Sequence, residues 1–314
     1  MGLNPAGVTE MSKTKNPMMH LLVMLAGALL LTLVVSFPMA LLPFVGVDIT
    51  SRGMTLLLQA IVQPITFLIP VLYVLYRYYR DERREFCRAD LSLGRWCQSG
   101  VGIVIVVLLA PFTDWITEWN NAWDLGLFGE VMRRVQDQTE GTLDTVMKTD
   151  SLGGMMVNML VIALIPAVCE ELFFRVGMQN LLERWMTGNY EGGKCRRYPS
   201  IWRHVAVWVT AMVFSLFHGE IFSFMPRFVM GLLLGYLYIY GNSVVVNVVA
   251  HFFNNALVVL MYWLSQCGVL SIDPEATMGF PALVTVSCTA ASLILFYVTF
   301  NKRKKEVEGS NPDC

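Results

Sequence analysis

The sequence predicts an all-α fold, a polytopic bundle of about eight transmembrane helices with both termini in the cytoplasm. The 314 residues are 55% hydrophobic and 15% charged, with a mean hydropathy of +0.54, which is too apolar for a soluble domain of this size. Apolar stretches of about 20 residues, long enough to cross the bilayer core as a helix, recur along the chain. The seven cysteines include no C-x-x-C pair, so we expect neither a disulfide framework nor a cysteine zinc site.

Eight apolar stretches are the predicted spans: 20–43, 54–79, 99–117, 153–183, 203–222, 224–241, 243–264 and 280–300. The first is longer than the core of a signal peptide and has no A-x-A cleavage site, so we expect it to be a retained span. The predicted organisation is a cytoplasmic segment (1–19), peripheral helices (20–150), a core of four spans (151–264), and a last span with a basic tail (265–314).

The basic residues give the orientation of this bundle. With the N-terminus inside, 17 of the 23 lysines and arginines fall on inner segments and 5 on outer segments, while Arg175 lies within a span. An excess of basic residues on the cytoplasmic side is typical of membrane proteins. We therefore expect a multi-pass integral membrane protein. Its compact chain carries no organelle signal, which favours a bacterial plasma (inner) membrane.

The longest outer loop, about 118–152, is acidic and contains apolar residues at helical spacing. The pattern predicts either a short interfacial helix or an ordinary solvated helix. Gly231 and Gly235 form a G-x-x-x-G pattern in the sixth span, for which we expect close helix packing within one molecule.

Three ionisable residues interrupt the fourth span: Glu170, Glu171 and Arg175. Charges near the middle of a bilayer are costly and usually functional. Glu171 and Arg175 are spaced i,i+4 and can pair on one helix face, whereas Glu170 points about 100° away. By elimination, Glu170 is left without a partner on its own helix, as suits a general base or acid. The alternative is a buried charge network that fixes helix packing.

Polar residues of two further spans lie at a similar depth. Counting ~1.5 Å per residue from the cytoplasmic ends places Glu170, Arg175, His218, His251 and Asn255 at ~13–22 Å. Asn247, His251 and Asn255 share a helix face at i,i+4 spacing, and such a face offers donors to a developing oxyanion. The alternative for this face is hydrogen bonding between helices.

Three motifs in order resemble the CPBP family of CAAX proteases and bacteriocin-processing proteins (Abi), to which the Ras-converting CAAX endopeptidases belong. They are Glu170-Glu171-x-x-x-Arg175, Phe214-x-x-x-His218 and His251-x-x-x-Asn255, and the resemblance covers roughly 150–260.

The resemblance implies an intramembrane endopeptidase that acts on a membrane-associated or lipidated peptide, with its site open toward the cytoplasm. It implies that Glu170 activates water with help from His218, and that His251 and Asn255 form the oxyanion site. Glu171 and Arg175 would hold the base in place. The expected partners are the lipid bilayer and a peptide or protein substrate, with no nucleic acid.

The family has also been described as metalloproteases, and Glu170, His218 and His251 with a water could hold one zinc ion. The chain has no HExxH, however, and no two of these ligands are spaced i,i+4. We therefore favour glutamate-activated water without a metal. Two non-hydrolytic functions are the alternatives: a proton- or ion-coupled carrier, although no inverted repeat is evident, and a non-catalytic membrane scaffold or immunity protein.

Overall fold

The computed structural model of the chain describes residues 16–188, 201–271 and 276–309, with side chains described up to Phe300. The described residues form helices and connections without a strand, which confirms the predicted all-α fold. Several inner basic residues used for the orientation lie outside the described residues: Lys13, Lys15, Lys194, Arg196 and Arg197.

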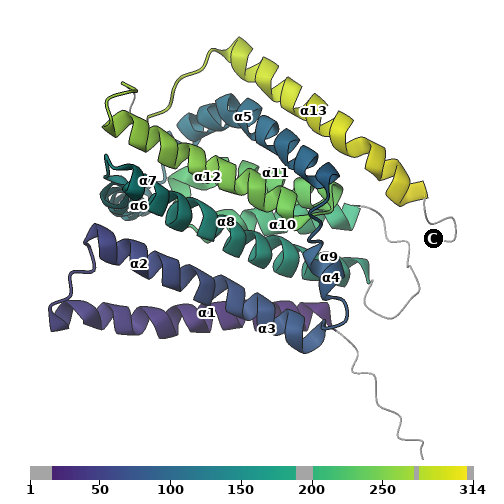
Figure 1. Cartoon of the computed structure of the whole chain (residues 1–314), viewed down its shortest axis with the longest axis horizontal. Coiled ribbons are helices and arrows are strands. Elements are labelled where there is room, and N and C mark those ends of the chain that lie inside the picture. The colour runs from purple at the N-terminus through teal and green to yellow at the C-terminus, as the bar shows by residue number, and fades with distance from the viewer. Residues whose placement is uncertain (1–15, 189–200, 272–275, 310–314) are drawn as a thin grey trace, which may run out of the picture.

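The described α-helices, labelled in Figure 1, are α1 (Pro17–Leu41), α2 (Arg52–Gln63), α3 (Ile69–Tyr78), α4 (Arg83–Cys87), α5 (Leu93–Asn121), α6 (Gly126–Met147), α7 (Leu152–Asn158), α8 (Ile165–Glu170), α9 (Asn180–Thr187), α10 (Ile201–Leu216), α11 (Phe224–Gly241), α12 (Val244–Gln266) and α13 (Ala282–Gly309). Wider π-helical stretches join some of them: η2 (Pro64–Leu68), η3 (Met159–Leu164) and η4 (Glu171–Gln179).

Within the described residues, 7 helical segments are long and apolar enough to cross a membrane. Two of them are composite: α2 and α3 form one segment through η2, and α7, α8 and α9 form another over Leu152–Thr187. The eighth predicted span corresponds to α10, a shorter apolar helix. The chain is therefore an integral multi-pass membrane protein with about eight spans.

Two of the π-helical stretches lie at or next to a proline. Pro64 begins η2, and Pro166 follows η3 by two residues. Proline cannot donate to the carbonyl one turn back, and a wider turn is one way for a helix to absorb that loss. The third stretch, η4, begins at Glu171 and contains no proline. Such stretches often occur at functional sites, and this one begins within the glutamate pair.

The helices pack as a layered bundle. In Figure 1, α13 lies beside α5 on one side and α1 beside α3 on the other, with α8, α10, α11 and α12 between them. The glycines of α11 face α10 closely, since a Cβ on Gly231 would lie 3.1 Å from Ala211 Cα and one on Gly235 2.7 Å from Val207 Cγ1. This confirms the close packing within one molecule that the G-x-x-x-G pattern predicts.

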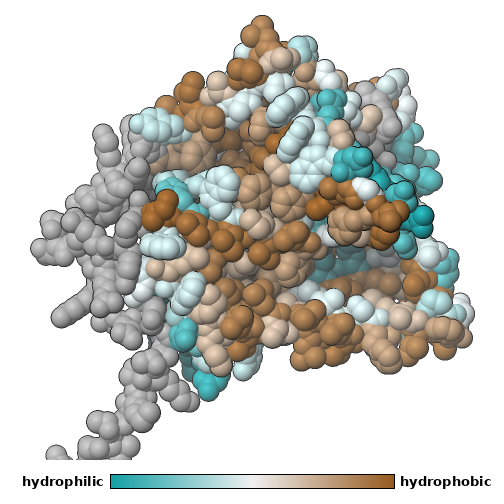
Figure 2. Space-filling model, turned by 180° about the vertical axis from the view of Figure 1, so that it is seen from behind, coloured by the Kyte–Doolittle hydropathy of each residue, from teal (hydrophilic) through white to brown (hydrophobic). Residues whose placement is uncertain are grey.

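The outer surface of the bundle is strongly apolar. On α1 and α13, Phe37 and Leu283 are 70% and 77% exposed, and Figure 2 shows hydrophobic side chains over much of one face. Such a surface fits contact with lipid. The outer loop forms α6, which is longer than expected; its Leu127, Phe128 and Val131 are exposed.

The two ends of the bundle carry different connections (Figure 1). One end holds α4, the end of α9 and the turn between α11 and α12; we call it the arginine end, for Arg84, Arg88, Arg95 and Arg184. The opposite end holds α6 and the connections from α10 to α11 and from α12 to α13; we call it the α6 end. In the orientation predicted from the basic residues, the arginine end is cytoplasmic.

Candidate active site

The glutamate pair lies where α8 gives way to the π-helical stretch η4. Glu170 is the last residue of α8 and is 6% exposed, whereas Glu171 and Arg175 are fully buried. Arg175 Nε donates to Glu171 Oε2 over 3.2 Å. The ion pair predicted from the i,i+4 spacing is therefore present.

Glu171 is the most heavily bonded carboxylate of the centre. Besides Arg175, it accepts a hydrogen bond from Asn247 Nδ2 at 3.1 Å and one from His251 Nδ1 at 2.9 Å. A buried carboxylate is tolerated only when charged and polar partners surround it. These contacts tie η4 to α12 and fix the orientation of the His251 ring. Asn247 is a member of this network that the three motifs do not include, although it is spaced i,i+4 from His251.

Glu170 stands in contrast to its neighbour. Its Oε2 lies 3.9 Å from His251 Nε2, and no hydrogen bond to its carboxylate is found within the described part of the chain. His251 thus presents one ring nitrogen to each glutamate. Because Nδ1 donates to the Glu171 carboxylate, that nitrogen carries a proton. The distance of 3.9 Å from Nε2 to Glu170 is too long for a direct hydrogen bond, and one water molecule can bridge it.

His218 lies just beyond the end of α10 rather than within a helix. The expected span over 203–222 is wrong at this point, because α10 ends at Leu216 and the chain turns at Gly219, where φ is +73°. His218 Nδ1 donates to Phe214 O over 2.8 Å, which leaves Nε2 as an acceptor. The Phe214 ring packs against both imidazoles, with centroid distances of 5.0 Å to His218 and 6.0 Å to His251.

Both imidazoles line one cavity of about 490 Å³. Asn255 also lines it and accepts a hydrogen bond from Asn254 Nδ2 at 3.3 Å. The two glutamates are not among the residues that line it, whereas His251, which lies against both of them, does line it. Arg227, counted from the sequence only as an outer basic residue, lines the same cavity and pairs with Glu220 at 2.6 Å. No sequence motif marks Arg227, because its place depends on how α11 packs.

The cavity runs toward the α6 end. Its walls include Asp114 and Thr117 in the second half of α5, and Met278 and Phe280 in the connection that precedes α13. Asp114 holds that connection in place by accepting from the backbone N–H groups of Met278 and Gly279, at 2.8 and 3.1 Å. The resemblance implied a site open toward the cytoplasm. No contact within the described residues tests that expectation, and it stays a prediction.

The donor set does not fit a metal ion as it stands. In the described ranges, no group of three or more His, Cys, Asp and Glu side chains lies close enough together to hold one. Glu170 and His251 face each other, but the Nδ1 of His251 is engaged by Glu171, and among the described residues no hydrogen bond or ion pair joins His218 to Glu170. We therefore derive no catalytic step through a metal.

The chain is thus a polytopic membrane protein in which acidic and imidazole side chains meet beside a cavity inside the helical bundle. Residues 152–257, about a third of the chain, match the family model described as Rce1-like, Type II CAAX prenyl endopeptidase Rce1-like. This match confirms the resemblance carried by the three motifs and supports an intramembrane protease in general. No curated protein and no solved structure matches the chain.

Proposed function

We propose that the protein is an intramembrane endopeptidase of a bacterial plasma membrane, which hydrolyses a peptide bond in a membrane-associated or lipidated substrate. One observation carries the proposal: Glu170 and His251 face each other at 3.9 Å within the bundle, and His251 also lines a cavity of about 490 Å³. The family match covers both residues.

In this proposal Glu170 is the general base. A water molecule between Glu170 Oε2 and His251 Nε2 gives a proton to Glu170 while its oxygen bonds to the carbonyl carbon of the substrate. The C–N bond then breaks, and the leaving amine takes the proton back from Glu170. His218 Nε2, the acceptor left by the Nδ1–H···O bond to Phe214, orients the water from the cavity side.

The oxyanion of the tetrahedral intermediate needs donors. Asn255 supplies its amide N–H, and His251 supplies Nε2–H when both of its ring nitrogens carry protons. Glu171 and Arg175 act through His251: they hold its Nδ1 in place and so aim Nε2 at the reacting atoms. They are positioning residues rather than groups that touch the substrate.

The experiment compares membranes that contain the wild-type chain, Glu170→Gln or Glu130→Gln. Glu130 lies exposed on α6, so its variant is a matched loss of one carboxylate outside the site. We expect new peptide termini with the wild type and Glu130→Gln, and none with Glu170→Gln. Identical termini in all three samples would contradict the proposal. A carrier would then be recognised by proton-coupled uptake in vesicles, and a scaffold by full biological activity of Glu170→Gln.

A further inference from the structure

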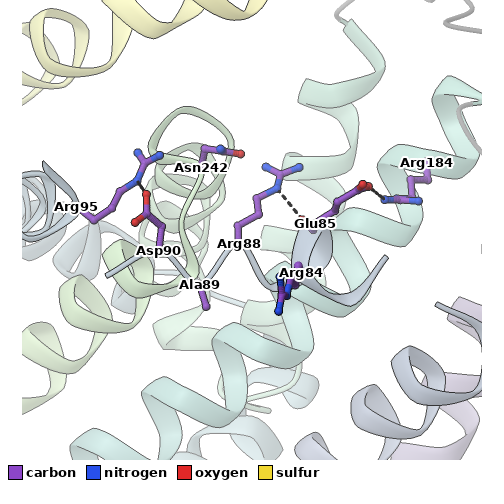
Figure 3. A pocket seen from close by; sticks show the side chains of 8 residues that line it. All are labelled: Arg84, Glu85, Arg88, Ala89, Asp90, Arg95, Arg184 and Asn242. Carbon is purple, nitrogen blue, oxygen red and sulfur yellow. Dashed lines mark hydrogen bonds and ion pairs between the residues drawn. The ribbon is translucent and has the colours of Figure 1, made fainter. Parts of the chain in front are cut away.

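A second cavity, of about 450 Å³, lies at the arginine end and is shown in Figure 3. We call it the arginine cavity. Its size is that of a small-molecule site. Four arginines line it against only two carboxylates: Arg84, Arg88, Arg95 and Arg184 against Glu85 and Asp90. The charge on its walls is therefore positive in balance, which favours an anionic ligand.

Two of the four arginines already have carboxylate partners. Arg95 is 7% exposed, and it donates to Asp90 over 2.9 Å and to the Gly241 carbonyl at the end of α11 over 2.6 Å. Arg184 of α9 lies 3.7 Å from Glu85 of α4. These contacts hold α4, α5, α9 and α11 around the arginine cavity and use both carboxylates of its wall.

The other two arginines have no carboxylate partner within the described residues. Arg84 is exposed, and its side chain makes no hydrogen bond or ion pair there. The Arg88 Nε donates to the backbone carbonyl of Glu85 over 3.3 Å, and its guanidinium lies 4.9 Å from the centroid of the Tyr238 ring. This stacking orients the Arg88 guanidinium while its remaining N–H groups stay available to a ligand.

The backbone of Arg88 is also unusual. Among the residues that the structure describes, only Arg88 and Asn242 combine a side chain with a positive φ, at +44° and +49°, and both line the arginine cavity. Asparagine adopts this conformation readily, but for arginine it is uncommon. Strained positions of this kind concentrate at ligand-binding sites. The conformation of Arg88 therefore fits a role in binding.

The place of the arginine cavity in the bundle indicates where its ligand comes from. The connection 79–92 and the turn at Asn242 each join two segments that are long and apolar enough to cross a membrane. The cavity therefore lies at the level where spans end and lipid headgroups begin. Next to it in the chain, Leu91, Leu93 and Trp96 are exposed. Exposed apolar and tryptophan side chains at this level fit contact with lipid.

We propose that the arginine cavity binds a phosphate group carried by an anionic membrane lipid. Arginine pairs with phosphate oxygens through two N–H groups at once, and basic pockets between spanning helices bind anionic headgroups. Free inorganic phosphate has the same chemistry at the arginines, but only a lipid also has acyl chains to cover Leu91, Leu93 and Trp96. The site depends neither on the proposed hydrolysis nor on which face of the membrane the arginine end occupies.

The test measures lipid binding by the purified full chain in a neutral detergent. Native mass spectrometry counts the molecules of phosphatidylglycerol or phosphatidylcholine that the protein retains, and thermal unfolding gives the stabilisation by each lipid or by inorganic phosphate. The first variant combines Arg84→Gln with Arg88→Gln. Its matched control combines Arg77→Gln with Arg80→Gln, which removes two exposed arginines at the same end but outside the cavity. A further variant, Arg84→Glu, reverses one exposed charge that has no bond to lose.

We expect the wild type and the control to retain phosphatidylglycerol in preference to phosphatidylcholine, and the Arg84/Arg88 variant to bind phosphatidylglycerol about 10-fold more weakly. Arg84→Glu should weaken binding as well, and it decides the question if the double variant does not fold. Equal retention of the two lipids by the wild type, or an equal loss in the control, would overturn the inference. Stabilisation by inorganic phosphate as large as that by phosphatidylglycerol would overturn the assignment to a lipid and leave a site for free phosphate.

Discussion

The two cavities are similar in volume, about 450 and 490 Å³, and differ in how their charges are satisfied. At the arginine end, Arg95 and Arg184 are held by nearby carboxylates, and Glu82 and Glu85 share Arg184. Near the other cavity, Glu171 accepts hydrogen bonds from Arg175, Asn247 and His251. Glu170 only faces His251, with 3.9 Å between its Oε2 and Nε2 of His251. Charge alone therefore does not identify a catalytic site. A buried carboxylate without a hydrogen-bond partner, beside one that is fully bonded, is more informative.

The largest expected effect is on the free energy of unfolding, and it is tested by breaking one ion pair near the catalytic cavity and one at the arginine end. Arg175→Leu leaves the Glu171 carboxylate buried with one partner fewer, and breaking such a pair costs about 3–5 kcal/mol. Arg184→Leu removes a partly exposed pair with Glu82, for which about 0–1 kcal/mol is typical. Thermal unfolding in detergent measures both. Equal shifts for the two variants would show that the Arg175 pair is no more important to the fold than the Arg184 pair.

Two histidines near opposite ends of α10 should differ in their effect on the cleavage rate. We expect His218→Ala to lower the cleavage rate by about 100-fold, because in the proposed mechanism His218 orients the attacking water from the cavity. The matched control is His204→Ala: His204 lies on the same helix α10 but contacts Tyr236 toward the arginine end. Initial rates with purified protein in liposomes measure the effect, and thermal unfolding shows whether each variant folds. A His204→Ala loss as large as that of His218→Ala would contradict the assignment.

The smallest effect concerns Asp90, at the arginine end between α4 and α5. The backbone N–H of Ser92 and then Arg95 hold the pKa of Asp90 below its usual value of 3.8. A carboxyl whose pKa is lowered in the folded state contributes stability above its ordinary pKa, and that contribution is lost as the pH falls through the folded pKa. We expect Asp90→Asn to unfold at a slightly lower temperature than the wild type at pH 7, with the difference shrinking as the pH falls below the ordinary Asp pKa of 3.8. A difference that persists in acid would point to another cause.

Local features of the site could be predicted from the sequence. The Glu171–Arg175 pair depends only on positions one helical turn apart, and the spans depend only on apolar length. The end of the span predicted over 203–222 was misjudged, because apolar residues recur past Leu216, where α10 ends. Asn247 was placed on the face of His251 by its i,i+4 spacing, but its bond to Glu171 depends on the packing of α12 against η4. Arg227 joins the cavity only through the packing of α11. The direction of the cavity follows from the same packing, which residue spacing within a single helix does not encode.

The most direct measurement concerns Glu170. Purified wild-type protein and Glu170→Gln, each in liposomes, are given the membrane segment whose new termini identify it as the substrate, and initial cleavage rates are compared. We expect Glu170→Gln to be slower by at least about 100-fold with an unchanged unfolding temperature, because the substitution removes the base but conserves the side-chain volume. Equal rates for the two proteins would contradict the role of Glu170 as the catalytic base.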